Sequence, residues 1–289
     1  MTERLRYLDN AEKIFVFDQV YPLSAASEQA TKKKLSAFGM LARVNLFNRP
    51  KEETVLLSKH ELRYEPFWHA VATRTADYSR ELVYPVEIGN AFAHRVIIDN
   101  KEYPVTEQGG RRIISLPGVE YSHRHIAFDE YVDGLSRELK KGALALYFKK
   151  QYTVQEHTVL ALPEAVVPQL RLPTLLQQIH QKLAADVINA HEFQEDLITI
   201  EKVHLYYRPV FAFEFTWTTE DKSGVIEVDG LTGDVIENGQ WFKEKLQAIT
   251  TRDMLFEMGS ELAGALVPGG SVAVKVIEKI VTDDDGPGV

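Results

Sequence analysis

The chain has 289 residues, of which 45% are hydrophobic and 26% are charged, a composition typical of a folded globular protein and not of a disordered one. Its 42 acidic and 33 basic side chains give a net charge of −9, which excludes a strong overall attraction to nucleic acid. Cysteine is absent, so disulfides, zinc sites built on thiolates and a cysteine nucleophile are excluded together.

The N-terminal segment, Met1 to Asp18, carries scattered charges and lacks the long apolar stretch of a secretory signal. No window of about 18 consecutive apolar residues occurs in the chain, so no transmembrane segment is expected. Together these observations predict a cytoplasmic protein.

The first predicted helix begins at the basic residues 32–34, which we interpret as a solvated helical face. Leu35, Phe38 and Leu41 then recur at helical spacing. Strands are predicted to follow from Leu57 onward, because the pattern changes to the alternation of polar and apolar residues that strands show.

An internal similarity links two distant parts of the chain. The stretch from Leu57 to Trp68 aligns without gaps with the stretch from Ile200 to Phe211, and each residue matches one 143 positions later. Both stretches contain a Tyr-x-Pro sequence, ending in Pro66 in the first copy and in Pro209 in the second. Because proline removes a ladder donor, both prolines are predicted at equivalent bends.

Each copy is also predicted to begin with a helix and to end with a third strand and a turn. The helix of the second copy is indicated by Leu175, Leu176, Ile179, Leu183 and Val187. Asp99-Asn100 and Asp229-Gly230 are the predicted turns, since short polar side chains and glycine tolerate positive φ. At the turns the offset falls from 143 to 130, which places 13 extra residues near Glu81 to Phe92.

Between the two copies the patterns are mixed. Gly109 to Pro117 is rich in turn residues, Phe128 to Lys141 is predicted to be helical, and Leu144 to Leu162 contains two apolar stretches typical of strands. The stretch from Leu162 to Pro173 contains three prolines and is the predicted linker.

The last strand of the second copy has the sequence Val225-Ile226-Glu227-Val228-Asp229-Gly230-Leu231-Thr232-Gly233-Asp234-Val235-Ile236. With the helix and strands before it, from Leu175 to Asn238, this stretch resembles the PepSY domain family, whose strand ends in a similar Val-x-Val-Asp-x-x-Thr-Gly-x-Val sequence. The resemblance covers about a fifth of the chain. It implies a small binding or inhibitory module without catalytic residues.

Two histidines are candidate metal ligands. His123 and His125 would point to the same face of a strand, where two imidazoles can bind a metal ion. A third ligand would have to come from Glu130, Asp129 or His94. Histidine pairs at this spacing are frequent on solvated strands, so a structural role is the main interpretation, and a metal site is the alternative.

The C-terminal region shows two apolar stripes, one before and one after Gly269-Gly270, that predict a helical hairpin. We interpret the hairpin as a contact surface for a partner, with packing against the chain's own sheets as the alternative. The acidic residues 283–285 disfavour a contact with anionic lipid. The candidate contact residues are Met254, Met258, Leu262, Leu266, Val276 and Ile280.

These observations together predict an α+β fold with two tandem helix-on-antiparallel-sheet modules and a C-terminal helical hairpin. The expected divisions are residues 1–106 for the first module, 107–169 for a strand-rich middle segment and linker, 170–245 for the second, PepSY-like module, and 246–289 for the hairpin and acidic tail. The predicted function is that of a non-catalytic binding or scaffold protein that needs no cofactor and engages a protein partner or assembles with itself. The alternative is a metal-dependent hydrolase that uses His123 and His125.

Overall fold

A computed structural model describes residues 4–39, 42, 49–140, 142–150, 152–247, 249–256 and 278–279. Of these residues, 52% are in strands and 16% are helical. The fold is therefore mostly β, and the prediction of an α+β protein made of tandem helix-on-sheet modules is wrong. The reason is that two alternating segments, predicted to break into several short strands, continue as single strands of 33 and 26 residues.

The elements follow one another in an order that alternates long strands with short connecting pieces. They are β1 (Arg4–Tyr7), β2 (Glu12–Phe17), α1 (Leu23–Lys33), the 3-10 helix η1 (Lys34–Phe38), β3 (Val55–Glu87), β4 (Arg95–Ile98), β5 (Lys101–Pro104), β6 (Thr106–Gln108), β7 (Arg111–Asp133), α3 (Leu146–Lys149), β8 (Val154–His157), β9 (Val159–Leu160), α4 (Leu172–Ala184), β10 (Glu192–Trp217), β11 (Lys222–Asp229), β12 (Val235–Gly239), β13 (Thr250–Thr251), α5 (Arg252–Leu255) and β14 (Glu278–Lys279).

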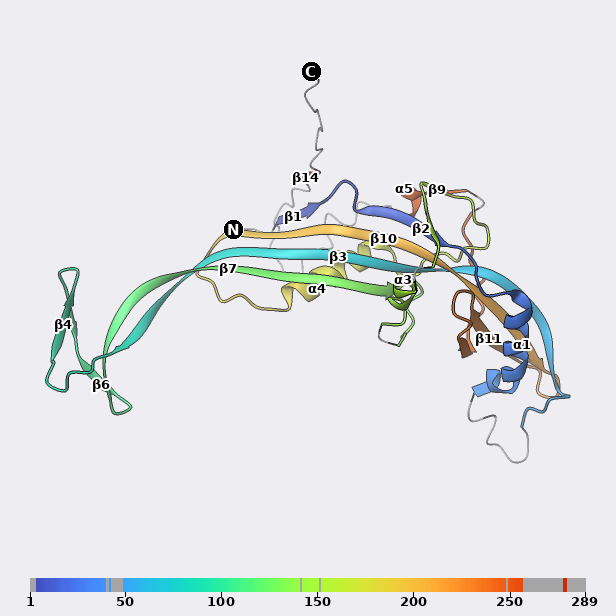
Figure 1. Ribbon diagram of the computed structural model, residues 1–289, viewed down its shortest axis with the longest axis horizontal. Helices are drawn as coiled ribbons and strands as arrows, with labels where there is room; N and C mark the ends of the chain where they lie inside the picture. The colour runs from blue at the N-terminus through green and yellow to red at the C-terminus, as the bar shows by residue number, and fades with distance from the viewer. Residues whose placement is uncertain are drawn as a thin grey trace, which may run out of the picture.

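One large mixed sheet organises the molecule. Its main path has the order β12-β11-β10-β3-β7-β6, and every pair along this path is antiparallel. β1 and β2 add to β10 in parallel, and β14 and β8 pair with them. Figure 1 shows β10, β3 and β7 side by side as a long curved band, with β7 at the lower margin in this view.

The two Tyr-x-Pro stretches lie opposite each other at the middle of this sheet. Tyr64 pairs with Pro209, and Tyr207 pairs with Pro66, across the β3–β10 ladder. The segments that align in sequence are therefore neighbouring antiparallel strands and do not belong to two separate sheets.

Each of the two prolines is hydrogen-bonded to the residue that follows the end of another strand. The Gly134 N–H, after β7, donates to the Pro66 carbonyl at 3.0 Å, and the Gly230 N–H, after β11, donates to the Pro209 carbonyl at 2.8 Å. A Cβ on Gly134 would lie 2.7 Å from the Pro66 oxygen, so only glycine fits this approach. The end of β11 thus corresponds in its contacts to the end of β7.

The pairing at the prolines corrects two local predictions. Residues 128–133, predicted to be helical, form the last part of β7. Asp99-Asn100, predicted to correspond to Asp229-Gly230, instead closes the separate β4–β5 hairpin. The turn itself is confirmed, because Asp99 and Asn100 have φ of 48° and 61°.

Helices cover both faces of the sheet. In α4 the buried residues Leu172, Leu175, Leu176, Ile179 and Leu183 form one stripe, which packs in a core with Trp68. The helix ends at Ala184, so Val187, expected in this stripe, is 86% exposed. α1 packs on the same face of the sheet as α4, against the C-terminal end of β10. α3 packs on the opposite face, against Phe67.

The predicted C-terminal hairpin is described only at its start. Met254 lies in α5 and is 52% exposed. The other five candidate contact residues, Met258, Leu262, Leu266, Val276 and Ile280, lie outside the described residues. In the part of the chain that the structure describes, no helix is long and apolar enough to cross a bilayer. The cytoplasmic location stays a prediction.

Candidate interaction surface

Residues 80–121 project beyond the other elements, and we call them the arm. β10 begins opposite Ser79, where it pairs through Glu192, so beyond this point β7 is the only strand partner of β3 among the described elements. The β4–β5 hairpin and β6 complete the arm, which extends away from the rest of the molecule in Figure 1. Ile113 and Ile114 are the only buried hydrophobic side chains in the arm. The arm therefore has almost no core of its own.

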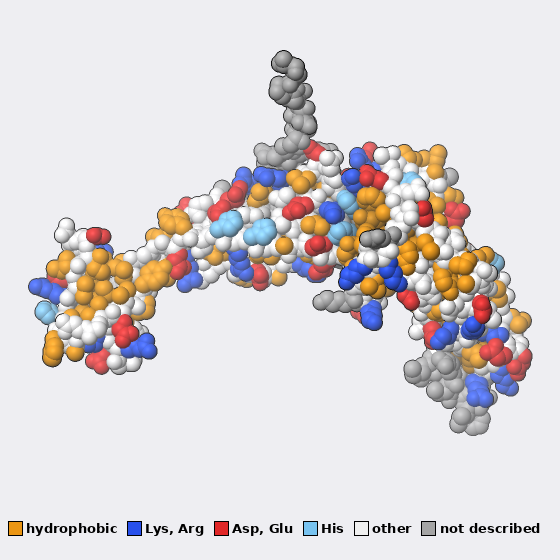
Figure 2. Space-filling model, in the orientation of Figure 1, with side chains coloured by type: hydrophobic (Ala, Val, Ile, Leu, Met, Phe, Trp, Pro, Cys, Tyr) orange, Lys and Arg blue, Asp and Glu red, His pale blue; other side chains and the backbone are white. Residues whose placement is uncertain are grey.

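Large hydrophobic side chains are exposed along the arm. Phe92 is 92% exposed and Ile97 is 63% exposed. Figure 2 shows apolar atoms gathered over the end of the arm. Val83 and Tyr84 are consecutive on β3 and point to opposite faces, so both faces of the ribbon present apolar surface. The exposed set consists of Val83, Tyr84, Val86, Phe92, Ile97, Ile98, Val119 and Tyr121.

Two prolines protect the outer edges of the arm. Pro85 lies opposite Ser115, and Pro117 lies opposite Val83. Because proline has no N–H to donate, both occupy ladder positions whose nitrogens face away from the opposite strand and toward an open edge. Proline on an edge strand blocks pairing with a further strand. The arm can therefore meet a partner through its faces more readily than through its edges.

The backbone of β7 alternates between bonds to β3 and exposure on the outer edge. The Ile88 N–H donates to the Arg112 carbonyl at 2.8 Å, and the Gly134 N–H donates to the Pro66 carbonyl at 3.0 Å. Even-numbered residues of β7 therefore bond to β3, and no register shift interrupts the ladder between them. Odd-numbered residues direct their N–H and C=O groups to the outer edge.

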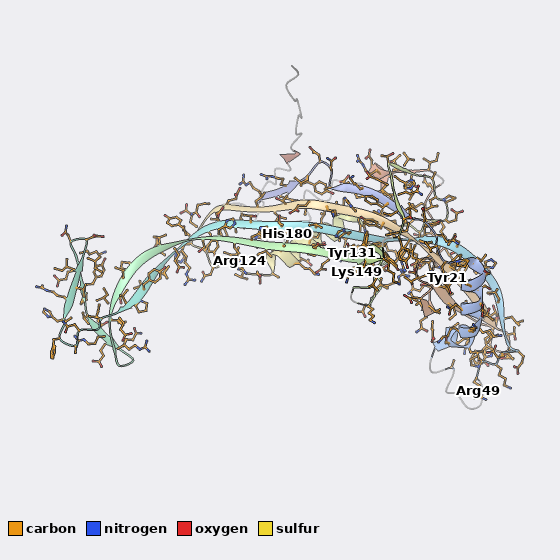
Figure 3. All side chains as sticks on the ribbon, viewed as in Figure 1. Tyr21, Arg49, Arg124, Tyr131, Lys149 and His180 are labelled. Carbon is orange, nitrogen blue, oxygen red and sulfur yellow. The ribbon has the colours of Figure 1, made fainter. Side chains whose placement is uncertain are left out.

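This outer edge is open beyond Pro117. Within the described residues, β6 is the only strand on this side of β7, and it pairs with Arg111 to Ile113. Beyond Ile113, as far as Asp133, the outer edge of β7 has no strand partner among the described elements. Figure 3 labels Arg124 and Tyr131, which belong to this part of β7. An open edge of this length is a template for an added strand.

A buried cluster of ionised side chains lies where β3 and β10 pair at the middle of the sheet, and we call it the charged centre. Glu65 lies directly opposite Arg208 in the ladder, and both side chains are buried. The charged centre consists of Arg63, Glu65, Asp133, Arg137, Arg208, Glu227 and Asp229.

Glu65 is the hub of the charged centre. Its Oε1 accepts from Arg63 at 2.6 Å, and its Oε2 accepts from Arg137 at 2.7 Å and from Arg208 at 2.9 Å. Burial alone raises the pKa of Glu65, but the three guanidiniums outweigh burial and hold the pKa at about 2. Glu65 is therefore ionised in the folded protein across the physiological range of pH.

The second carboxylate between the arginines is that of Glu227. Its Oε1 accepts from Arg63 at 2.6 Å and from the Gln240 N–H at 2.8 Å. Burial, followed by the nearby charge of Glu65, raises the pKa of Glu227. In one cluster, the pKa of Glu65 is thus below the ordinary value of a carboxyl group and the pKa of Glu227 is above it.

Three hollows of about 710, 500 and 680 Å³ surround the charged centre. Leu139, in the segment after β7, lines all three. The charged side chains of the centre that reach these hollows, such as Arg137 and Arg208, are already bonded to carboxylates of the same cluster. The charged centre therefore acts as a structural lock on the register of β3 and β10.

The structure places the two predicted metal ligands on β7. His123 and His125 share one face, as predicted, and both are exposed. The Nδ1 of His123 lies 2.7 Å from an oxygen of Asp77, on the neighbouring strand. Asp129 instead contacts His69 at 2.8 Å. Among the described residues, no group of three or more His, Asp or Glu side chains is arranged to hold a metal ion, so no observation favours the hydrolase alternative.

Sequence reasoning missed both the arm and the charged centre. The arm was missed because its exposed apolar residues, such as Val83 and Tyr84, form a short continuous apolar run of the kind that is typical of a buried strand. A signal for the charged centre was present, since Glu65 and Arg208 occupy the same place in the two aligned stretches and carry opposite charges.

Comparison with known proteins gives no relative for this chain. No family model matches it, and neither does a curated protein or a solved structure. The resemblance of residues 175–238 to PepSY domains therefore stays a prediction.

Proposed function

We propose that this chain is a non-catalytic binding protein that engages another protein through its arm. The observation that carries the proposal is the exposure of large apolar side chains on both faces of a two-stranded ribbon that has almost no core. Such surfaces on soluble proteins are typical of interaction sites.

The energetics of the arm favour a covered state. An isolated two-stranded ribbon is marginally stable in water, and a partner on its faces would supply the missing core. Burying side chains such as Phe92 and Ile97 contributes about 1.5–3 kcal/mol each. Phe92 lies in the loop before β4 and Ile97 lies in β4 itself, so the exposed apolar surface extends over more than one part of the arm.

The charges of the arm favour a protein over an anionic membrane as the partner. The arm contains five Lys and Arg side chains and six Asp and Glu side chains. An amphipathic surface that binds anionic lipid carries an excess of basic residues, which the arm lacks.

The test replaces exposed apolar residues of the arm by charged ones. Phe92→Asp combined with Ile97→Asp is expected to abolish capture of the partner from the native cell, because a charge would have to be buried in the contact. For the partner identified with the wild type, the dissociation constant measured by titration calorimetry should rise more than tenfold.

Val187→Asp is the matched control, since Val187 is equally apolar, is 86% exposed and lies outside the arm. This variant should capture the partner as the wild type does. Capture that survives the double substitution in the arm, or that is lost equally in the control, would contradict the proposal.

A further inference from the structure

The open edge of β7 beyond Pro117 carries a second inference, which concerns the backbone edge of this strand, including the last residues of the arm, and does not depend on partner binding by the faces of the arm. Odd-numbered residues from Val119 to Tyr131 present their N–H and C=O groups outward, and within the described residues no strand takes them up. Val119 is 50% exposed and Tyr121 is 79% exposed, so the side chains beside this edge are accessible as well.

We propose that a second copy of this chain pairs with the edge, β7 against β7, antiparallel about a two-fold axis at Ser122. A two-fold contact between identical edges is self-complementary, because each residue that meets another is met by it in return. With the axis at Ser122, outward-facing residues meet outward-facing residues, as the hydrogen bonds of an antiparallel ladder require.

The side chains in this register are complementary on both faces. Glu120 lies opposite Arg124 of the second copy, and the two-fold axis makes this opposite-charge pair twice. On the other face, Tyr121 lies opposite His123 of the second copy. Inside one chain, Glu120 accepts from the Tyr84 hydroxyl at 2.7 Å, and Arg124 donates to Asp186 at 3.0 Å, so both side chains are already held beside the edge.

Pro117 limits the length of the contact. In this register it lies opposite Ala127 of the second copy, and its nitrogen cannot donate across the edge. The paired region is therefore centred on residues 118–126 and does not continue along the arm. The faces of the arm from residue 80 to Pro117 stay available for another partner.

Because the chain contains no cysteine, a single introduced cysteine can test the register by cross-linking. Ser122 occupies a position whose backbone bonds to β3, so the two Ser122 Cα atoms would lie about 4.5 Å apart, within reach of a disulfide. Under mild oxidation, Ser122→Cys is expected to give mostly a cross-linked dimer on a non-reducing gel.

Ser115→Cys is the matched control, because Ser115 is exposed on the same strand. Its two copies would lie about 48 Å apart at roughly 3.4 Å per residue, and no cross-link should form. Equal cross-linking of both variants would show random collision and would overturn the proposal.

Charge exchange tests the same register without cysteine. Sedimentation of the wild type should show a mass of twice 32.8 kDa. Glu120→Arg is expected to weaken the dimer more than tenfold by placing like charges opposite each other, and adding Arg124→Glu in the same chain should restore it.

Tyr121→Pro should also give a monomer with an unchanged circular dichroism spectrum, because it removes an outward N–H and no bond to β3. Tyr121→Ala keeps that N–H and should remain dimeric. A wild type that stays monomeric at all concentrations would overturn the proposal. The open edge would then be a site for a strand of a different protein. A dimer that survives both Tyr121→Pro and Glu120→Arg would also overturn the proposal.

Discussion

At the scale of the residue, the charged centre shows how position decides the chemistry of a carboxyl group. Glu65 and Glu227 both bond to Arg63, and both are buried. Glu65 is surrounded by three guanidiniums, which lower its pKa, whereas burial and the charge of Glu65 raise the pKa of Glu227. The folded protein therefore stabilises the charge of Glu65 and opposes the charge of Glu227.

Glutamine substitutions at these two positions should have unequal costs. Glu65→Gln is expected to lower the free energy of unfolding by about 3–5 kcal/mol near neutral pH, because it leaves buried arginines without their shared carboxylate. Glu227→Gln should cost less, because it replaces a charge that the folded state opposes. Urea unfolding of the two variants beside the wild type measures both changes.

The pH dependence of the Glu65 variant has a definite sign. The pKa of Glu65 is about 2 in the folded protein and 4.5 as its ordinary value, so its stabilisation is complete above pH 4.5. As the pH falls from 4.5 toward 2, the wild type loses this stabilisation. The difference between the wild type and Glu65→Gln should therefore shrink on acidification, and a difference that stays constant or grows would contradict this account.

At the scale of the element, β7 has three different environments along its length. It begins in the arm, paired with β3 and β6, continues with one open edge, and ends against the middle of the sheet. The tight contact of Gly134 with Pro66 fixes that end and brings Asp133 to Arg137 at 3.0 Å. The end of β7 thus connects the arm to the charged centre.

Alanine substitutions test this connection. Gly134→Ala is expected to destabilise the protein by about 1–3 kcal/mol, because its Cβ would lie too close to the Pro66 carbonyl and the end of β7 would have to shift. Gly89→Ala is the control, since a Cβ there meets nothing within 4 Å. Thermal unfolding monitored by circular dichroism compares the two, and equal stability would mean that the end of β7 yields without cost.

At the scale of the whole molecule, the sequence predicts local features better than their assembly. The helical stripe of α4 and the turn at Asp99-Asn100 could be predicted, because each depends on residues close together in the chain. The pairing of β3 with β10 could not, because strand alternation does not tell which strands become neighbours. The matching sequences at Pro66 and Pro209 were consistent with two separate sheets or with one.

The same limit applies to the candidate surface. The sequence of β3 continues as one strand from the centre of the sheet into the arm, and only the end of β10 opposite Ser79 reveals that the arm stands alone. The prediction of a binding protein came from the internal repeat, the resemblance to PepSY domains, the predicted C-terminal hairpin and the lack of catalytic motifs. The arm gives that prediction a specific surface.

The main claim is that the arm binds a partner and contributes little to the fold. A chain from which the arm has been removed tests both parts of this claim. Leu82 and Gly118 lie opposite each other, so Asn-Gly can replace residues 83–117 as a two-residue hairpin turn. The shortened chain should unfold cooperatively at a temperature within a few degrees of the wild type and should no longer capture the partner. A shortened chain that fails to fold, or that folds and still captures the partner, would contradict the account.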